Sequence, residues 1–311
     1  MEFEQLLEQK TEEVNRILEE YLPECMEQEQ EGIIQDAMRY SVKAGGKRLR
    51  PMILLEVCRM FSADARVLKT AECFAAALEM IHTYSLVHDD LPAMDNDEYR
   101  RGMLTTHAKY GEAFGILAGD ALLNEAFYIC ARETEALIAE TVADRELLTN
   151  ASAAVKAQRI LAEYAGKDGM IKGQEIDLVS EGKTVDSARL MQMYELKTSR
   201  LLEAAFTIGA VLGGCNAEQQ EQAYRAASAL GRAFQLRDDI LDLIGDEKKL
   251  GKPVKSDLRN EKSTYVSLEG FEKTEAEIRC LTQEAVDCLS HLPGDGEFMK
   301  KLMLFLIQRD Y

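Results

Sequence analysis

The chain has 311 residues and 46% of them are hydrophobic, so it is long enough to bury a sizeable core. Its 55 acidic residues outnumber 37 basic ones, and the formal net charge of -18 argues against nucleic acid or an anionic membrane surface as a partner. The N-terminus is acidic, no window offers roughly 20 apolar residues, and the seven cysteines form no C-x-x-C pair. We therefore expect a cytoplasmic protein with free thiols and no integral membrane segment.

Helical periodicity runs through almost the whole chain. Apolar residues recur at helical spacing over 66–88, 113–131 and 219–244, only five prolines occur, and no stretch alternates like a strand. Many of these segments are hydrophobic on more than one side, which indicates burial inside a bundle. We predict an all-α single domain over 1–311, a bundle of long antiparallel helices. Its breaks are expected at 45–46, 166–169, 213–214, 245–253 and 293–296.

The first Asp-rich segment is Asp89-Asp90-Leu91-Pro92-Ala93-Met94-Asp95. Six residues turn a straight helix by about 600°, so Asp89 and Asp95 would face apart. Pro92 cannot sit inside a regular helix, and a helix that ends there lets Asp95 swing back toward Asp89. The plainer alternative is a helix end followed by an acidic loop.

The second Asp-rich segment is Asp238-Asp239-Ile240-Leu241-Asp242. Asp238 and Asp242 are four apart, so their carboxylates share one helix face, with Asp239 beside them. Three clustered carboxylates need a cation, and oxygen ligands suit Mg²⁺. The alternative is a solvated acidic face, although the residues around these aspartates are mostly apolar.

Cations follow the first Asp motif and also precede it. Arg100 and Arg101 come directly after it, and upstream Gly45-Gly46 leads into a basic cluster through Arg50. Arginine binds phosphate oxygens in a bidentate manner, and glycines let the backbone approach an anion closely. Together with the carboxylates, these cations suggest a site for two polyanions, one held through metal and one held directly.

The motifs occur in a recognisable order along the chain: GGKRLRP, HDDLPAMD followed by RRG, GDALL, KGQEIDL, LKT, FQLRDDILD, GKP and EKST. This set resembles the trans (E)-prenyl diphosphate synthases, also called polyprenyl synthetases, from about residue 30 to the C-terminal end. Within that family the resemblance is greatest to bacterial farnesyl diphosphate synthases. It implies an isoprenoid synthase fold around a central cavity, a homodimer, and three Mg²⁺ ions per active site.

The resemblance also implies a role for each polar site residue. Metal would be bound by Asp89, Asp90, Asp95, Asp238 and Asp242, with Asp239 in the same motif. The allylic diphosphate would contact Arg100, Lys197 and Lys252, and isopentenyl diphosphate would contact Lys47, Arg50, His82 and Arg101. Thr198 and Gln235 would face the allylic cation, and Gln174, Asp177 and Lys262 would line or close the cavity. A lone histidine such as His82 is otherwise usually a satisfied core residue.

In the family, the residue five before the first Asp helps to set product length, and here it is Tyr84. It lies about 7.5 Å from Asp89 along the helix. Its ring would stop a growing chain early, whereas Ser85 is too small to block anything. Ordinary core packing of Tyr84 is compatible with that role. The expected product is farnesyl diphosphate (C15), made from isopentenyl diphosphate and dimethylallyl or geranyl diphosphate.

Three alternatives stay open at this point. The nearest is the same chemistry with a longer product, geranylgeranyl diphosphate (C20). Head-to-head condensing enzymes and terpene cyclases also use Asp-rich motifs, but they lack the GGKRLRP cluster. A non-catalytic helical scaffold or partner-binding protein would have to carry two such motifs by accident. The lysine at 255, where relatives often carry a small residue, puts the contacts of 245–262 in doubt.

Overall fold

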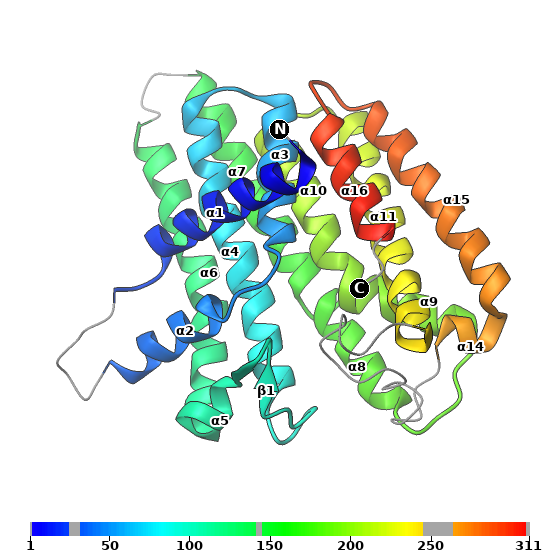
Figure 1. Cartoon of the computed structure of the whole chain (residues 1–311). Helices are drawn as coiled ribbons and strands as arrows, with labels where there is room; N and C mark the ends of the chain where they lie inside the picture. Colours follow the sequence, from blue (N-terminus) through cyan, green and yellow to red (C-terminus); the bar gives the residue numbers. More distant parts are fainter. Residues whose placement is uncertain (1, 25–31, 141–144, 245–263, 309–311) are drawn as a thin grey trace. The chain divides into compact units, whose positions relative to one another are not determined.

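The computed structural model describes residues 2–24, 32–140, 145–244 and 264–308 (Figure 1). These residues are helical almost throughout, which confirms the all-α class. They group into two compact units, a first unit of Met1–Leu55 with Ala63–Gln158 and a second unit of Glu56–Ser62 with Arg159–Tyr311. The prediction of one domain over the whole chain stays a prediction. Each described cysteine is a free thiol, as expected.

The first unit contains two long helices, α4 (Ala65–Asp89) and α6 (Glu112–Glu140), that pack on each other. Its elements are α1 (Phe3–Tyr21), α2 (Ile33–Lys43), the start of α3 (Leu49–Phe61), α4 (Ala65–Asp89), β1 (Tyr99–Arg100), β2 (Met103–Leu104), α5 (Thr106–Tyr110), α6 (Glu112–Glu140) and most of α7 (Arg145–Ala165). Helix α4 packs mainly on α6. Every residue from 73 to 81 is buried, because α4 is apolar on more than one side.

A short antiparallel hairpin, β1–β2, corrects the expectation that the chain forms no strand. Tyr99 pairs with Leu104 and Arg100 pairs with Met103. The two loop residues have positive φ, 55° at Arg101 and 77° at Gly102. Positive φ at both positions matches the twist of a two-residue hairpin turn. This hairpin follows the first Asp motif directly and sets the direction of Arg100 and Arg101.

The second unit places the second Asp motif near the end of a long buried helix. Its elements are the end of α7, α8 (Met170–Ser180), α9 (Ser187–Tyr194), a π-helical turn η1 (Glu195–Ser199), α10 (Arg200–Leu212), α11 (Ala217–Ile244), α14 (Tyr265–Glu269), α15 (Phe271–Ser290) and α16 (Glu297–Gln308). Helix α11 packs on α15 and α10, and α8 packs on η1. The predicted breaks are confirmed at four places, and the fifth, 245–253, lies outside the described residues.

Helix α6 corrects the expectation that no segment is apolar enough for a membrane span. Residues Glu112–Ala139 reach a mean hydropathy of 1.3 and pass by length and composition. A core helix of a soluble protein has the same length and composition, so one such helix is weak evidence for a membrane span. Helix α6 packs against α4, and 39% of its apolar window is buried.

Candidate functional site

The four side chains predicted to hold isopentenyl diphosphate line one pocket of the first unit. Lys47, Arg50, His82 and Arg101 surround a volume of about 540 Å³. A side chain at Gly46 would come within 2.6 Å of the Arg101 guanidinium and displace it, and the φ of 131° at this position also favours glycine. Arg101 also donates a hydrogen bond to the carbonyl of this Gly-Gly loop. The Gly45-Gly46 loop and the hairpin are therefore in contact, which brings Arg101 close to the basic cluster after the loop.

Arg48, in the middle of the same basic cluster, has a structural role instead. It is 5% exposed and forms a buried ion pair of 2.8 Å with Glu79. Its other nitrogens donate to Asn15 (2.9 Å) and to the Val42 carbonyl (2.6 Å). A buried pair of this kind is costly to break from one side. Glu79, which the sequence did not single out, therefore anchors the loop through its ion pair with Arg48.

The electrostatics of this pocket favour an anion. Burial, followed by the positive charges of Arg50 and Arg101, holds the pKa of His82 well below its usual 6.5, so the imidazole is neutral near pH 7. Its Nε2 lies 3.4 Å from a guanidinium nitrogen of Arg50. The Arg50 Nε is buried and has no hydrogen-bond partner among the described residues. Burial also lowers the pKa of Arg50, although Glu79 opposes that shift.

The first Asp motif folds back on itself, as the Pro92 argument predicts. Helix α4 ends at Asp89, and the backbone N–H of Asp95 donates to the Asp89 carbonyl at 2.8 Å. Asn96 follows with φ of 54°. The two backbones are therefore adjacent, which a continuous helix would not allow.

Asp90 is engaged within the protein. Its carboxylate accepts from Arg100 Nε at 2.7 Å and from a terminal nitrogen of Arg100 at 2.6 Å. Burial raises the pKa of Asp90, and the Arg100 charge opposes that shift. Asp90 as a metal ligand and Arg100 as a diphosphate contact remain predictions.

The second Asp motif differs from expectation in one respect. Asp238 and Asp242 lie one turn apart on α11, but Asp239 does not join them. Asp239 is 2% exposed, and its carboxylate accepts from the Tyr194 hydroxyl (2.8 and 2.9 Å to its two oxygens) and from the Tyr265 N–H at 2.7 Å. The predicted cluster of three carboxylates is wrong, because Asp239 ties α11 to α9 and α14.

The donor set of each motif fits magnesium in a particular way. Within residues 2–24, 32–140, 145–244 and 264–308, no three acidic, histidine or cysteine side chains lie close enough to bind a metal by themselves. Each motif offers two carboxylates. Mg²⁺ keeps several waters and is usually held by one or two carboxylates together with substrate phosphates. Asp89 with Asp95, and Asp238 with Asp242, fit that pattern.

The predicted cation-facing residues meet in a second pocket, which lies within the second unit. Lys197, Thr198 and Gln235 line a cavity of about 230 Å³, together with Tyr194 and Asp177. Lys197 is half-buried and its ammonium lies 2.5 Å from the Asp177 carboxylate. Gln174, one turn earlier on α8, is half-buried.

The backbone around Lys197 is unusual, and the sequence analysis missed it. Lys197 and Thr198 lie in the π-helical turn η1, and such turns are rare and frequent at functional sites. A side chain at Gly173 would approach the Lys197 backbone nitrogen to 2.1 Å. One at Gly231 would approach the Ser199 hydroxyl to 2.3 Å. Gly173 in the KGQEIDL segment and Gly231 on α11 were the sequence features that could have indicated this close packing around the π-helical turn.

The remaining predicted residues have simple positions. Tyr84 is buried on α4 with its ring edge-on to His88, 5.7 Å between ring centres. Ser85 is half-buried and donates to the His82 carbonyl. Lys252 and Lys262 lie outside the described residues, so their roles stay predictions.

Comparison with known proteins adds to this geometry. The polyprenyl synthetase family model matches residues 31–291. The chain belongs to the polyprenyl synthetase family. It is similar to a farnesyl diphosphate synthase of Geobacillus stearothermophilus (38% identity, 99% of this chain and 98% of that one) and to a geranylgeranyl diphosphate synthase of Cyanophora paradoxa (38%, 94% and 93%). A geranyltransferase structure from Helicobacter pylori, complexed with magnesium and isoprenyl diphosphate, superposes with a TM-score of 0.77 (28%, 97% and 96%).

This polyprenyl synthetase is therefore a prenyltransferase with the all-α fold of the isoprenoid synthases. Polyprenyl synthetases use Mg²⁺, which agrees with the oxygen-only donors of the two Asp motifs. The family match covers both motifs and the basic pocket.

Proposed function

We propose that this polyprenyl synthetase condenses isopentenyl diphosphate with dimethylallyl or geranyl diphosphate to give farnesyl diphosphate. The basic pocket of the first unit carries this proposal, because Lys47, Arg50 and Arg101 surround an anion-sized space whose described lining includes one acidic side chain, Glu79. A second diphosphate site separates a condensing enzyme from a terpene cyclase, which needs one diphosphate substrate.

In this proposal the chain's residues bind the two diphosphates differently. Asp89 with Asp95, and Asp238 with Asp242, would be the Mg²⁺ ligands, and three Mg²⁺ ions would neutralise the allylic diphosphate. Metal bound there withdraws electrons from the leaving group and lowers the barrier to C–O cleavage. Arg100 would add a bidentate contact, and Lys252 a further cation. Lys47, Arg50, His82 and Arg101 would orient isopentenyl diphosphate by direct contacts.

The pocket of the second unit suits a developing allylic cation. The Thr198 hydroxyl, the Gln235 amide and the Lys197 carbonyl offer dipoles in a confined volume, where fixed dipoles stabilise charge strongly. The isopentenyl double bond attacks the cation, and a proton then leaves to the departing pyrophosphate. This route requires no side-chain base.

Product length is the finer part of the proposal. Relatives named for C15 and for C20 products are equally similar to this chain. Tyr84 favours C15, because a bulky buried ring five residues before Asp89 limits the space for a growing tail. Geranylgeranyl diphosphate remains the second candidate.

We further infer a cytoplasmic homodimer. Ile116, Leu117, Tyr128 and Ile138 on α6 are each more than 40% exposed, which is unusual for large apolar residues on one helix. A second copy of the chain would cover this face. Light scattering of the purified protein tests the mass in solution.

The deciding experiment is a turnover assay with labelled isopentenyl diphosphate, each allylic primer and Mg²⁺, followed by chromatography of the products. We expect a C15 product and loss of turnover with a chelator. A C20 product would support the second candidate. Absence of turnover with every primer would contradict the enzyme proposal, and turnover of one allylic diphosphate without isopentenyl diphosphate would indicate a cyclase.

A further inference from the structure

The π-helical turn η1 brings together residues that are five apart in the sequence. The backbone N–H of Arg200 donates to the Glu195 carbonyl, which closes the turn. The Ser199 hydroxyl donates to the Tyr194 carbonyl, again across five residues, at 3.4 Å. Lys197 and Thr198 lie inside this turn. Its geometry therefore decides where the two side chains point.

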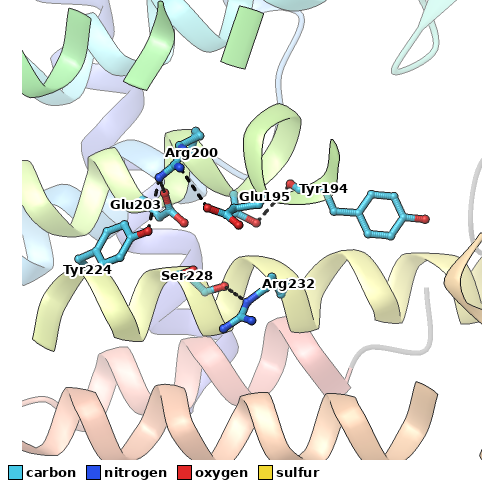
Figure 2. Close-up of polar contacts among 8 residues, drawn as sticks. Tyr194, Glu195, Arg200, Glu203, Tyr224, Ser228 and Arg232 are labelled. Carbon is cyan, nitrogen blue, oxygen red and sulfur yellow. Dashed lines mark hydrogen bonds and ion pairs between the residues drawn. The ribbon is translucent and has the colours of Figure 1, made fainter. Parts of the chain in front are cut away.

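Arg200 connects both sides of the turn through its side chain. One terminal nitrogen lies 3.0 Å from Glu195, at the start of η1. The other lies 2.7 Å from Glu203 on α10 and 3.5 Å from the Tyr224 hydroxyl on α11. Figure 2 shows Arg200 between the two carboxylates, and the ring of Tyr194 pointing away from them. The guanidinium also lies 5.4 Å from the centre of the Tyr164 ring.

The pair between Glu195 and Arg200 depends on the π geometry. On an α-helix, residues five apart point about 140° away from each other and cannot meet. The ion pair forms because the turn holds one extra residue. The same ion pair must then favour the π turn over a regular α-helical turn, since only the π turn satisfies it.

The Glu203 end of the bridge is firmly fixed. Glu203 is fully buried, and burial raises its pKa while the Arg200 charge opposes that shift. For Arg200, burial lowers the pKa, but Glu203, Tyr224 and Glu195 together oppose it and the net shift is upward. A buried carboxylate needs its partner, so Arg200 stays at Glu203 and offers its second nitrogen to Glu195. A planar fork can bridge in this way, whereas a lysine ammonium is a single point charge.

We propose that Arg200 is a positioning residue whose bridge from Glu195 to Glu203 holds η1 in its π form and so aims Lys197 and Thr198 at the allylic substrate; this rests on the proposed function. Loss of the bulge would shift the register by one residue and rotate one side of the turn by about 100°. Neither Glu195 nor Arg200 lines the pocket of the second unit.

The test is Glu195→Ala, because truncation of Arg200 would leave Glu203 buried and unpaired and could unfold the protein. Glu195 is half-buried, so its pair contributes about 1 kcal/mol or less to stability. We expect a melting temperature within about 3 °C of the wild type. Because about 1 kcal/mol corresponds to about a fivefold change in an equilibrium, we also expect kcat to fall about three- to fivefold, with a raised KM for the allylic substrate and an unchanged KM for isopentenyl diphosphate.

Two further variants separate positioning from general stability. Glu275→Ala removes a comparable half-buried pair, Arg237–Glu275 at 2.9 Å, and should leave kcat unchanged. Glu195→Gln keeps an acceptor oxygen for Arg200 and should recover part of the lost kcat. Equal kcat losses in Glu195→Ala and Glu275→Ala would overturn the proposal. So would kinetic constants of Glu195→Ala within twofold of the wild type.

A readout without turnover keeps this proposal apart from the proposed function. Amide hydrogen exchange at residues 196–200 should be faster in Glu195→Ala than in the wild type, and unchanged in Glu275→Ala. An inactive wild type with this exchange difference would contradict the proposed function but not the role of the bridge in holding the turn. Unchanged exchange in Glu195→Ala would overturn the bridge itself.

Discussion

The Tyr194 hydroxyl lies 2.9 and 2.8 Å from the two carboxylate oxygens of Asp239, and both side chains are buried. The backbone N–H of Tyr265 donates to the same carboxylate. The middle aspartate of the second motif thus joins three helices, α9, α11 and α14. In the first motif, Asp90 is held by Arg100 in a similar way. The second aspartate of each motif acts as an anchor.

Removal of the Tyr194 hydroxyl tests this anchor. Tyr194→Phe should lower the free energy of unfolding by about 1–3 kcal/mol, because it removes a hydrogen bond to a buried charged group. Urea denaturation measures the change. Tyr265→Phe is the control, since Tyr265 contacts Asp239 through its backbone N–H and not through its hydroxyl. Equal effects in the two variants would contradict the anchoring role.

Truncation of an outer aspartate tests the metal assignment. Asp89→Ala and Asp238→Ala should each lower turnover by about 100-fold or more, because each removes charge stabilisation of the leaving group. Circular dichroism should show an unchanged helical content. Glu98→Ala, in the exposed acidic loop after the first motif, should keep normal turnover. A near-normal rate in either aspartate variant would remove that motif from the metal site.

Tyr84→Ala should lengthen the product beyond C15. Truncation of the buried ring opens space along α4, and it should also cost about 3–5 kcal/mol of stability. Chromatography of the products at low temperature checks the length while the variant stays folded. Ser85→Ala should leave the product unchanged. A C15 product from Tyr84→Ala would sink the argument that this ring sets product length.

His82 makes stability depend on pH. The folded protein holds the pKa of His82 well below 6.5 through burial and the neighbouring arginines. The unfolded chain therefore takes up the proton first as pH falls below about 6.5, and stability is lost there. His82→Gln should flatten the slope of the unfolding free energy by at most about 1.4 kcal/mol per pH unit. An unchanged slope in His82→Gln would contradict this assignment.

Local rules allowed the sequence to predict much of the site. Pro92 forces a helix end by sterics, so the return of Asp95 to Asp89 was predictable and is confirmed. The four-residue spacing of Asp238 and Asp242 likewise defines a helix face. The grouping of Lys47, Arg50, His82 and Arg101 came from the family resemblance, since nothing in their spacing relates residues that lie up to 54 positions apart.

Other features depend on partners that sequence spacing does not reveal. Nothing near Arg48 indicates that it pairs with Glu79 in the core while its neighbours line a pocket. Nothing near Asp239 indicates that it faces Tyr194 and Tyr265 instead of its fellow aspartates. The π turn at Lys197 needs the close approach of Gly173 on α8 and Gly231 on α11. Periodicity alone would continue the α-helix through it.

By itself, the sequence determined the helical class, the helix breaks and the two acidic motifs, because these follow from backbone sterics and the repeat of apolar residues along one segment. Only the tertiary structure decided which charged side chains form ion pairs and hydrogen bonds inside the protein and which line its pockets. A carboxylate that has lost its water must find a donor, and the donor lies on whichever helix packs against it. That choice places Asp90 against Arg100 and Asp239 against Tyr194.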